Sequence, residues 1–183
     1  MVLLLVACGQ QDEVIGEGGS SGAVHLDAQS VPAPVFHAVD QDGQAFNSAS
    51  LSGTPWVASF FFTSCQTVCP ELNTIKSELH TEFGDRIKFV SISTDPENDS
   101  VEKLHEYAAS FGATAGTWWM VRMPQDSMRQ LAQDGFHVMD PSEPSMHSTR
   151  LVAVTANMTI AGYFDSAESK DMEALHVWMS SQQ

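Results

Sequence analysis

The stretch Phe60-Phe61-Phe62-Thr63-Ser64-Cys65-Gln66-Thr67-Val68-Cys69-Pro70 decides the fold. A near-continuous apolar run from Trp56 to Thr63 ends just before the first cysteine, and a helical pattern begins at the second. Apolar runs of this length are typical of strands in a sheet that is covered on both faces. Backbone N–H groups at a helix N-terminus favour thiolate over thiol. The pattern therefore predicts a strand, a cysteine loop and a helix, with a reactive pair of sulfur atoms at the junction.

Paired thiolates can exchange a disulfide or hold a soft metal ion, and the spacing alone leaves both open. As a redox pair, Cys65 is the expected nucleophile and Cys69 the resolving thiol. Three residues between the cysteines, instead of two, widen the loop and favour a metal. An inert disulfide is a weaker interpretation, because so short a loop removes little entropy from the unfolded chain. Zinc and peroxidase chemistry are weaker still, since we can name no water-activating carboxylate and no arginine close in sequence.

Strands and helices alternate along the rest of the chain. Helical spacing with a glycine at the end predicts a helix from Pro70 to Gly84, and Asp99 or Ser100 can cap a second one. The remaining expected strands are 36–39, 44–46, 87–93, 118–123, 150–155 and 159–164, and the remaining expected helices are 126–134 and one through Met172, Leu175 and Trp178. This order predicts an α/β fold with a mostly parallel central sheet, a C-terminal β-hairpin and helices on both faces.

Composition limits the class of protein. At 183 residues the chain is long enough for one domain with a core, which we place at residues 31–183. Its 8 Lys and Arg stand against 23 Asp and Glu, for a net charge of −15. So acidic a surface repels phosphate backbones, and we expect no nucleic-acid partner.

The N-terminus resembles a targeting segment. Residues 1–8 resemble the end of a truncated signal peptide, and Leu5-Val6-Ala7-Cys8 resembles a bacterial lipobox, in which the cysteine is lipidated. Residues 9–30 are acidic and rich in Gly and Ser, which predicts a flexible linker. We therefore expect an exported, periplasmic protein that is anchored to a membrane by lipid at Cys8, where an oxidising compartment lets a cysteine pair cycle or bind metal.

Four features together resemble the Sco (SenC) family of copper-binding assembly proteins. They are Asp42-Gly43-Gln44-Ala45-Phe46, the Phe-rich strand that leads into Cys65-x-x-x-Cys69-Pro70, the acidic motif Ser93-Thr94-Asp95-Pro96-Glu97-Asn98-Asp99, and His147 shortly before the strand at 151–155. The order of strands and helices is also similar to that of thioredoxin-like proteins. The resemblance covers roughly residues 32–180.

The resemblance implies a thioredoxin-like copper chaperone. It implies that one copper ion, as Cu(I) or Cu(II), is held by Cys65, Cys69 and His147, a soft set of ligands that suits Cu(I). The implied client is the dinuclear copper site of cytochrome c oxidase subunit II or another cuproprotein. Handing over copper is not substrate turnover, so we expect a metallochaperone instead of an enzyme. The alternative is a thiol–disulfide oxidoreductase that keeps client cysteines reduced.

Two further groups of residues have competing interpretations. The family resemblance implies that Asp95 and Asp99 act as a latch near the copper loop, whereas the local pattern favours Asp99 as the cap of the second helix. Six histidines are interpreted as solvated or core side chains without a metal: His25, His37, His80, His105, His137 and His176. Most of the 9 methionines are interpreted as core filler.

Overall fold

The computed structural model describes residues 24–25, 31–138 and 149–182. The predictions for residues 1–23, with the lipobox cysteine Cys8, and for His147 lie outside these ranges. Within them, no helix is both long enough and apolar enough to cross a membrane.

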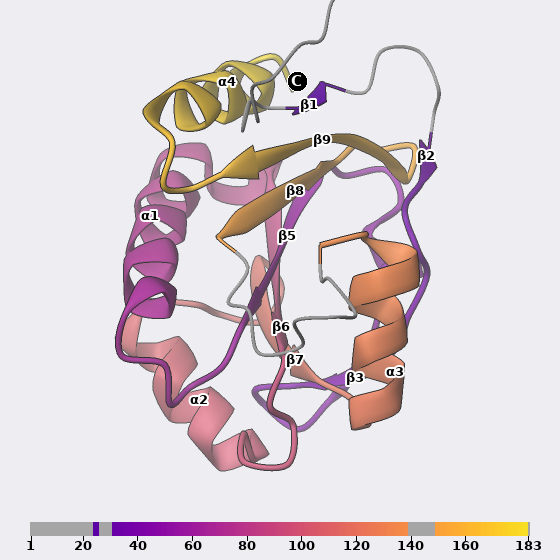
Figure 1. Ribbon diagram of the computed structural model, residues 1–183, viewed down its shortest axis with the longest axis vertical. Coiled ribbons are helices and arrows are strands. Elements are labelled where there is room, and N and C mark those ends of the chain that lie inside the picture. Colours follow the sequence, from indigo (N-terminus) through magenta and orange to yellow (C-terminus); the bar gives the residue numbers. More distant parts are fainter. Residues whose placement is uncertain (1–23, 26–30, 139–148, 183) are drawn as a thin grey trace, which may run out of the picture.

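The secondary structure follows the predicted order closely (Figure 1). The strands are β1 (Val24–His25), β2 (Val31–Pro32), β3 (His37–Asp40), β4 (Ala45–Asn47), β5 (Trp56–Phe61), β6 (Lys88–Ser93), β7 (Trp118–Arg122), β8 (Arg150–Val154) and β9 (Thr159–Asp165). The helices are α1 (Val68–Phe83), α2 (Val101–Ser110), α3 (Gln125–Gln130) and α4 (Ser169–Ser180), with 3₁₀ turns at Ser48–Leu51 and Gly84–Arg86 and a π-helical turn at Leu131–Gly135.

The described strands form one mixed sheet in the order β1-β9-β8-β5-β6-β7-β3-β4, with β2 also paired to β9. The α/β class and the C-terminal hairpin β8–β9 are confirmed. Parallel pairing, however, is limited to β5–β6 and β6–β7, and every other described pair is antiparallel. The sheet is less parallel than predicted because a hairpin adds to each side of the three central strands: β8–β9 on β5, and β3–β4 on β7.

Helices cover both faces of this sheet, as predicted (Figure 1). One core contains apolar residues from α1, α2 and α4, and a second core on the opposite face contains residues from α3 and the π-helical turn. Side chains of β5 alternate between the two: Trp56 and Phe60 lie in the second core, and Val57 and Phe61 in the first. This alternation explains the near-continuous apolar run, since a strand covered on both faces buries every residue.

Helix α1 begins two residues before Pro70, and this proline lies in its first turn, where a missing N–H breaks no helical hydrogen bond. The helix ends at Gly84, as predicted, with a φ of 55° that favours glycine. The predicted helix 126–134 instead consists of α3 and the π-helical turn that follows it.

The parallel strands β5 and β6 end at the same edge of the sheet. Each is followed by a loop and a helix: the cysteine loop leads from β5 to α1, and residues 94–100 lead from β6 to α2. Two segments that both carry polar residues are thus brought side by side, at the carboxyl ends of strands where α/β proteins commonly place functional groups.

Candidate functional site

The cysteine loop brings the two sulfur atoms of Cys65 and Cys69 together at the N-terminal turn of α1. The backbone N–H of Cys69 points at the sulfur of Cys65, with a nitrogen–sulfur distance of 3.4 Å. The hydroxyl oxygen of Thr67 lies 3.7 Å from the same sulfur. Both cysteines are reduced and buried. The prediction that a strand passes into a helix at this pair, with backbone N–H groups directed at sulfur, is confirmed.

The two thiols differ in acidity. Burial opposes ionisation of Cys65, but hydrogen bonds from the Cys69 thiol, the backbone N–H groups of Thr67 and Cys69, and the Thr67 hydroxyl outweigh it and lower the pKa of Cys65 to about 7. Burial, together with the hydrogen bond that its thiol donates to Cys65, raises the pKa of Cys69 to about 12. Above neutral pH the pair therefore holds one negative charge, mainly on Cys65, which makes Cys65 the nucleophilic sulfur.

Asp99 ties the neighbouring loop to the start of the cysteine loop. Its carboxylate is fully buried and accepts hydrogen bonds from the hydroxyl of Thr63 at 2.5 Å and from the hydroxyl of Ser93 at 2.5 Å. The backbone N–H of Thr63 also points at both carboxylate oxygens, at 3.3 Å. The interpretation of Asp99 as the cap of the second helix is therefore wrong. Ser100 is the N-cap, because its hydroxyl accepts a hydrogen bond from the N–H of Lys103 at 3.3 Å.

Asp95 does not reach the cysteines in this arrangement. Its carboxylate oxygens accept hydrogen bonds from the side-chain amide of Asn98 at 2.9 and 3.0 Å, and its carbonyl accepts from the backbone N–H of Asp99. The guanidinium of Arg122 donates to the carbonyl of Pro96 at 2.6 Å. The acidic motif is thus a closed turn whose last residue, Asp99, contacts the segment before the cysteines.

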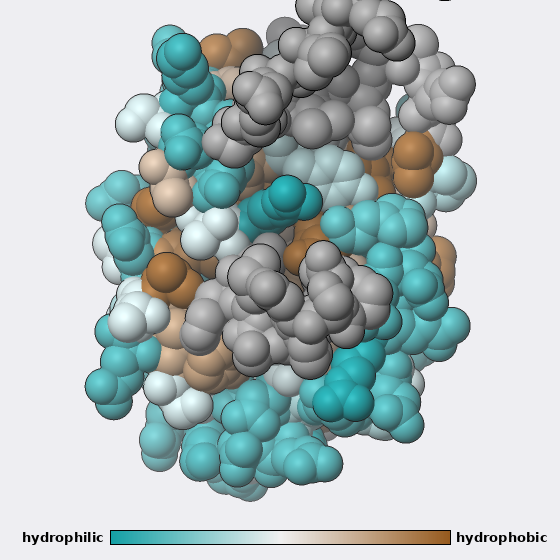
Figure 2. Space-filling model, viewed as in Figure 1, coloured by the Kyte–Doolittle hydropathy of each residue, from teal (hydrophilic) through white to brown (hydrophobic). Residues whose placement is uncertain are grey.

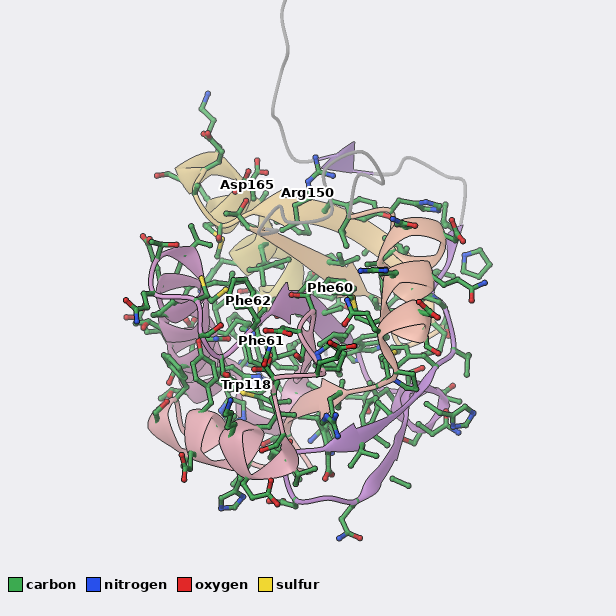
Figure 3. All side chains as sticks on the ribbon, turned by 60° about the horizontal axis from the view of Figure 1, so that its bottom comes forward. Phe60, Phe61, Phe62, Trp118, Arg150 and Asp165 are labelled. Atoms are coloured by element: carbon green, nitrogen blue, oxygen red, sulfur yellow. The ribbon has the colours of Figure 1, made fainter. Side chains whose placement is uncertain are left out.

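Aromatic side chains form the wall of the site. The ring of Tyr107, on α2, stacks on Phe61 with a centroid distance of 5.4 Å, and its hydroxyl accepts a hydrogen bond from Asn73 at 3.1 Å. Burial raises the pKa of Tyr107 to about 12. The hydrogen bond from Asn73 opposes this shift, and the negative charges of Cys69, Cys65 and Asp99 add to it. Figure 3 shows Phe60, Phe61 and Phe62 together at the end of β5.

The surface next to the site is partly apolar. Phe62 and Val68, which flank the cysteine loop, are only partly buried. The face shown in Figure 2 is largely hydrophilic, with apolar residues gathered on the side of α1.

A buried lysine lies under the cysteine helix and was missed by sequence reasoning. Lys76 has no exposed surface, and its ammonium donates hydrogen bonds to Ser59 and Ser91 at 2.6 and 2.5 Å. The signal was present in the helical spacing, because positions 72, 76, 79 and 83 share one face of α1. The serines were equally visible, as polar residues in otherwise apolar strands.

Four of the other histidines have exposed positions or structural contacts. His105 pairs with Asp42 at 3.1 Å and His176 with Glu82 at 2.8 Å, while His80 packs its ring against Trp118 and His37 is exposed. In the ranges that the structure covers, no group of three or more His, Cys, Asp or Glu side chains could hold a metal ion. The donors described at this site are the two sulfur atoms, a soft pair that fits a soft cation.

Comparison with known proteins identifies relatives of the chain. The family model SCO1/SenC matches residues 26–178. The SCO1 protein homolog of Bacillus subtilis (strain 168) is 30% identical over 101 residues, which cover 53% of this chain and 52% of the relative. The chain thus spans about half the length of this curated relative.

Solved structures share the fold. BsSco, a member of the Sco family of cytochrome c oxidase assembly proteins in which a disulfide switch was identified, aligns with a TM-score of 0.73 and 23% identity, over 85% of this chain and 95% of that one. Arabidopsis thaliana ScoI with copper bound aligns with a TM-score of 0.67 and 19% identity, over 84% of this chain and 100% of that one. The predicted thioredoxin-like fold is confirmed.

Proposed function

The chain belongs to the SCO1/SenC family, and on this premise we propose that it is a copper chaperone. In this proposal it binds one copper ion through the sulfur atoms of Cys65 and Cys69 and the imidazole of His147, and passes the ion to a client protein. The copper is cargo, so the protein is a metallochaperone and not an enzyme.

The paired sulfur atoms at the start of α1 carry the proposal. With a pKa of about 7, Cys65 is about half ionised at pH 7 and more so above it, so it offers a thiolate without help from the metal. Cys69 keeps its proton until a metal ion replaces it. Only an ion with a high affinity for thiolates can displace that proton near neutral pH, so the site favours such ions. Cu(I) accepts two thiolates and an imidazole. The copper that is bound to Arabidopsis ScoI, a protein of the same fold, supports this choice of metal.

The unequal acidity of the two thiols also suits release of the copper ion to a client. Protonation of Cys69 detaches one ligand first, so a client can replace the ligands one at a time. We propose the dinuclear copper site of cytochrome c oxidase subunit II as the receiving site, with another cuproprotein as the alternative client. The description of BsSco as a cytochrome c oxidase assembly protein supports this client.

Copper binding of the reduced chain tests the proposal. We expect one tightly bound copper per chain and, with Cu(II), a thiolate charge-transfer band that His147→Ala abolishes. His105→Ala is the matched control, because this exposed histidine pairs only with Asp42 at the surface and its loss should leave binding unchanged. A reduced wild-type chain that binds no tight copper would rule out the chaperone.

The unequal acidity of the thiols favours one second function, a thiol–disulfide oxidoreductase that keeps client cysteines reduced. Cys65 attacks the client disulfide as a thiolate, and Cys69 resolves the mixed disulfide. The two functions separate in His147→Ala, which should lose copper and keep its reductase activity, whereas Cys65→Ser loses both.

We further propose that the protein is exported to the periplasm and anchored by lipid at Cys8. The oxidising conditions there suit a pair of sulfur atoms that must be either reduced or metallated. Labelling of the chain with a radioactive fatty acid in a bacterial host tests this: wild type should incorporate label and sediment with membranes, and Cys8→Ala should do neither.

A further inference from the structure

Lys76 is the one basic side chain that is buried among the described residues. Its ammonium has three N–H donors, and three neutral groups surround it. Two are the hydroxyl oxygens of Ser59 and Ser91, and the third is the ring of Trp118, whose centroid lies 5.1 Å away. Trp118 is held in place by its own hydrogen bond to Ser91 at 2.9 Å.

This surrounding shell carries no negative charge, so a charged Lys76 is costly. Burial lowers the pKa of Lys76 to about 7, and the negative charge of Cys69 acts in the opposite direction. The effect is reciprocal, because the Lys76 charge in turn favours the Cys69 thiolate. The thiolate of Cys69 is therefore the counter-charge that favours a charged Lys76.

The placement of Lys76 on α1 explains this coupling. It follows Cys69 by seven residues, or about two turns, so both lie on one face of the helix at a rise of about 10 Å. Side chains in a helix lean toward its N-terminus, which brings the ammonium back toward the cysteines. Figure 3 shows Trp118 near the layer of α1 and α2, and both α1 and Trp118 belong to the same core.

The charge of the metal decides what this buried cation does. Two thiolates with a monovalent ion have a net charge of −1, whereas two thiolates with a divalent ion are neutral, and an imidazole adds no charge to either. We propose, on the basis of the proposed function, that Lys76 is a positioning residue whose buried charge makes the cysteine site favour Cu(I) over divalent ions. The sulfur atoms bind the metal. The metal-free pair, with Cys65 ionised and Cys69 protonated, and the monovalent complex both have a net charge of −1. The charge of Lys76 therefore favours these two states over the neutral divalent complex.

The expected effect is measurable. Two unit charges about 8 Å apart, at an effective dielectric constant of about 20, change a binding equilibrium about 30-fold. Lys76→Met keeps the length and apolar character of the side chain and removes the charge. It should strengthen binding of a divalent ion about 30-fold and change Cu(I) binding by less than about threefold, because only the divalent ion changes the net charge of the site.

The test uses the reduced full-length chain in a Cys8→Ser background, so that only Cys65 and Cys69 offer thiols. Cu(I) and Ag(I) are the monovalent probes, and Cd(II) is a soft divalent probe that does not oxidise thiols. Affinities come from competition with a chelator of known affinity, at one pH. Circular dichroism melting of the metal-free variants shows that each is folded.

Two further variants separate the buried charge from side-chain packing and from the net charge of the chain. Lys76→Gln keeps N–H donors for the serines without the charge, and it should gain divalent affinity as Lys76→Met does. Lys170→Met removes an exposed lysine on α4 and changes the net charge of the chain equally, and it should leave every affinity unchanged.

Each result decides the assignment. A selective gain of Cd(II) affinity over Cu(I) and Ag(I) affinity in both Lys76 variants supports it. Equal changes for monovalent and divalent ions, no change, or a wild-type Cd(II) affinity in Lys76→Gln overturns it and leaves the copper chaperone standing. A wild-type chain that binds neither Cu(I) nor Ag(I) overturns the proposed function and this assignment with it.

Discussion

Cys65 and Cys69 are the same residue type four positions apart, and they differ because of what points at each sulfur. Cys65 accepts hydrogen bonds from N–H, S–H and O–H donors at the start of a helix, and these stabilise its thiolate. Cys69 is more deeply enclosed and donates its S–H to Cys65. The site thus provides one ionised ligand and one protonated ligand, and binding of a cation must release the proton of Cys69.

Thr67 provides a test of this account at the scale of a single side chain. Thr67→Val removes the hydroxyl 3.7 Å from the Cys65 sulfur and so removes a donor that favours the thiolate. The pKa of Cys65 should rise by roughly half a unit to one unit. The pH dependence of iodoacetamide alkylation, followed at Cys65 by peptide mass spectrometry on the reduced metal-free chain, measures it. Thr81→Val, an exposed position on the same helix, is the control; an unmoved midpoint in Thr67→Val would show that the hydroxyl has no part.

At the scale of elements, Asp99 joins three parts of the fold. It precedes α2, accepts a hydrogen bond from Ser93 at the end of β6, and accepts others from Thr63 at the end of β5. The segment that leads into the cysteine loop is therefore fixed by a residue 36 positions later in the chain. The position of the sulfur atoms depends on this contact as well as on α1.

Removal of the Asp99 carboxylate should destabilise the protein. Asp99→Ala leaves the Thr63 N–H and two hydroxyls without their acceptor, and we expect a loss of about 2 to 4 kcal/mol in the free energy of unfolding. Asp95→Ala, which breaks only contacts to the exposed Asn98 amide, should cost less than about 1 kcal/mol. Urea unfolding of the metal-free chain measures both, and equal losses would contradict the role given to Asp99.

Local periodicity predicted most elements because each one has a clear signal. Side chains of the strand that begins at Trp56 alternate between the two cores, which explains why the whole strand is apolar. The positive φ of Gly84 explains why a glycine marks the end of α1. Asp99 was misread for a physical reason: an acidic residue before a helix satisfies the capping pattern, and nothing local reveals a partner at Thr63. The parallel fraction of the sheet was overestimated because the pairing of β3 with β7 is also non-local.

The candidate site was predictable only in part. Cys65 and Cys69 share one loop, so their proximity follows from spacing. Lys76 was missed because an isolated lysine within an apolar stripe is usually assigned to solvent, and its partners Ser59 and Ser91 come from two other strands. For His147, 78 positions beyond Cys69, spacing carries no information, and its role as a ligand stays a prediction.

At the scale of the whole molecule, the site contains residues from the segments that follow the parallel strands β5 and β6 and from helix α1, which packs on those strands. The cysteine loop follows β5, the Asp99 segment follows β6, and Lys76 reaches serines on both strands. Because Ser59 and Ser91 are direct partners in the β5–β6 register, one ammonium contacts both. Proton binding at the site is therefore coupled to the packing of α1 on the sheet, and through it to global stability.

The direction of this coupling with pH follows from the two lowered pKa values. Lys76 has a pKa of about 7 in the folded chain against an ordinary value of 10.5, and Cys65 has a pKa of about 7 against an ordinary value of 9.0. Between pH 7 and 9 the unfolded chain thus binds more protons than the folded chain at both groups, and stability rises with pH. Cys69, with its pKa raised to about 12 from 9.0, has the opposite effect only above pH 9.

Unfolding measured between pH 7 and 9 therefore isolates the contribution of Lys76 to the pH dependence of stability. The free energy of unfolding of the reduced metal-free chain should rise with pH, and Lys76 should contribute about 1 kcal/mol per pH unit to that slope. Lys76→Met should flatten the slope by this amount and be the more stable protein at pH 7, because it buries no charge. Cys65→Ser should remove a separate, smaller part of the slope. Urea unfolding at four pH values measures it, and a slope in Lys76→Met as steep as in wild type would mean that Lys76 stays protonated throughout this range.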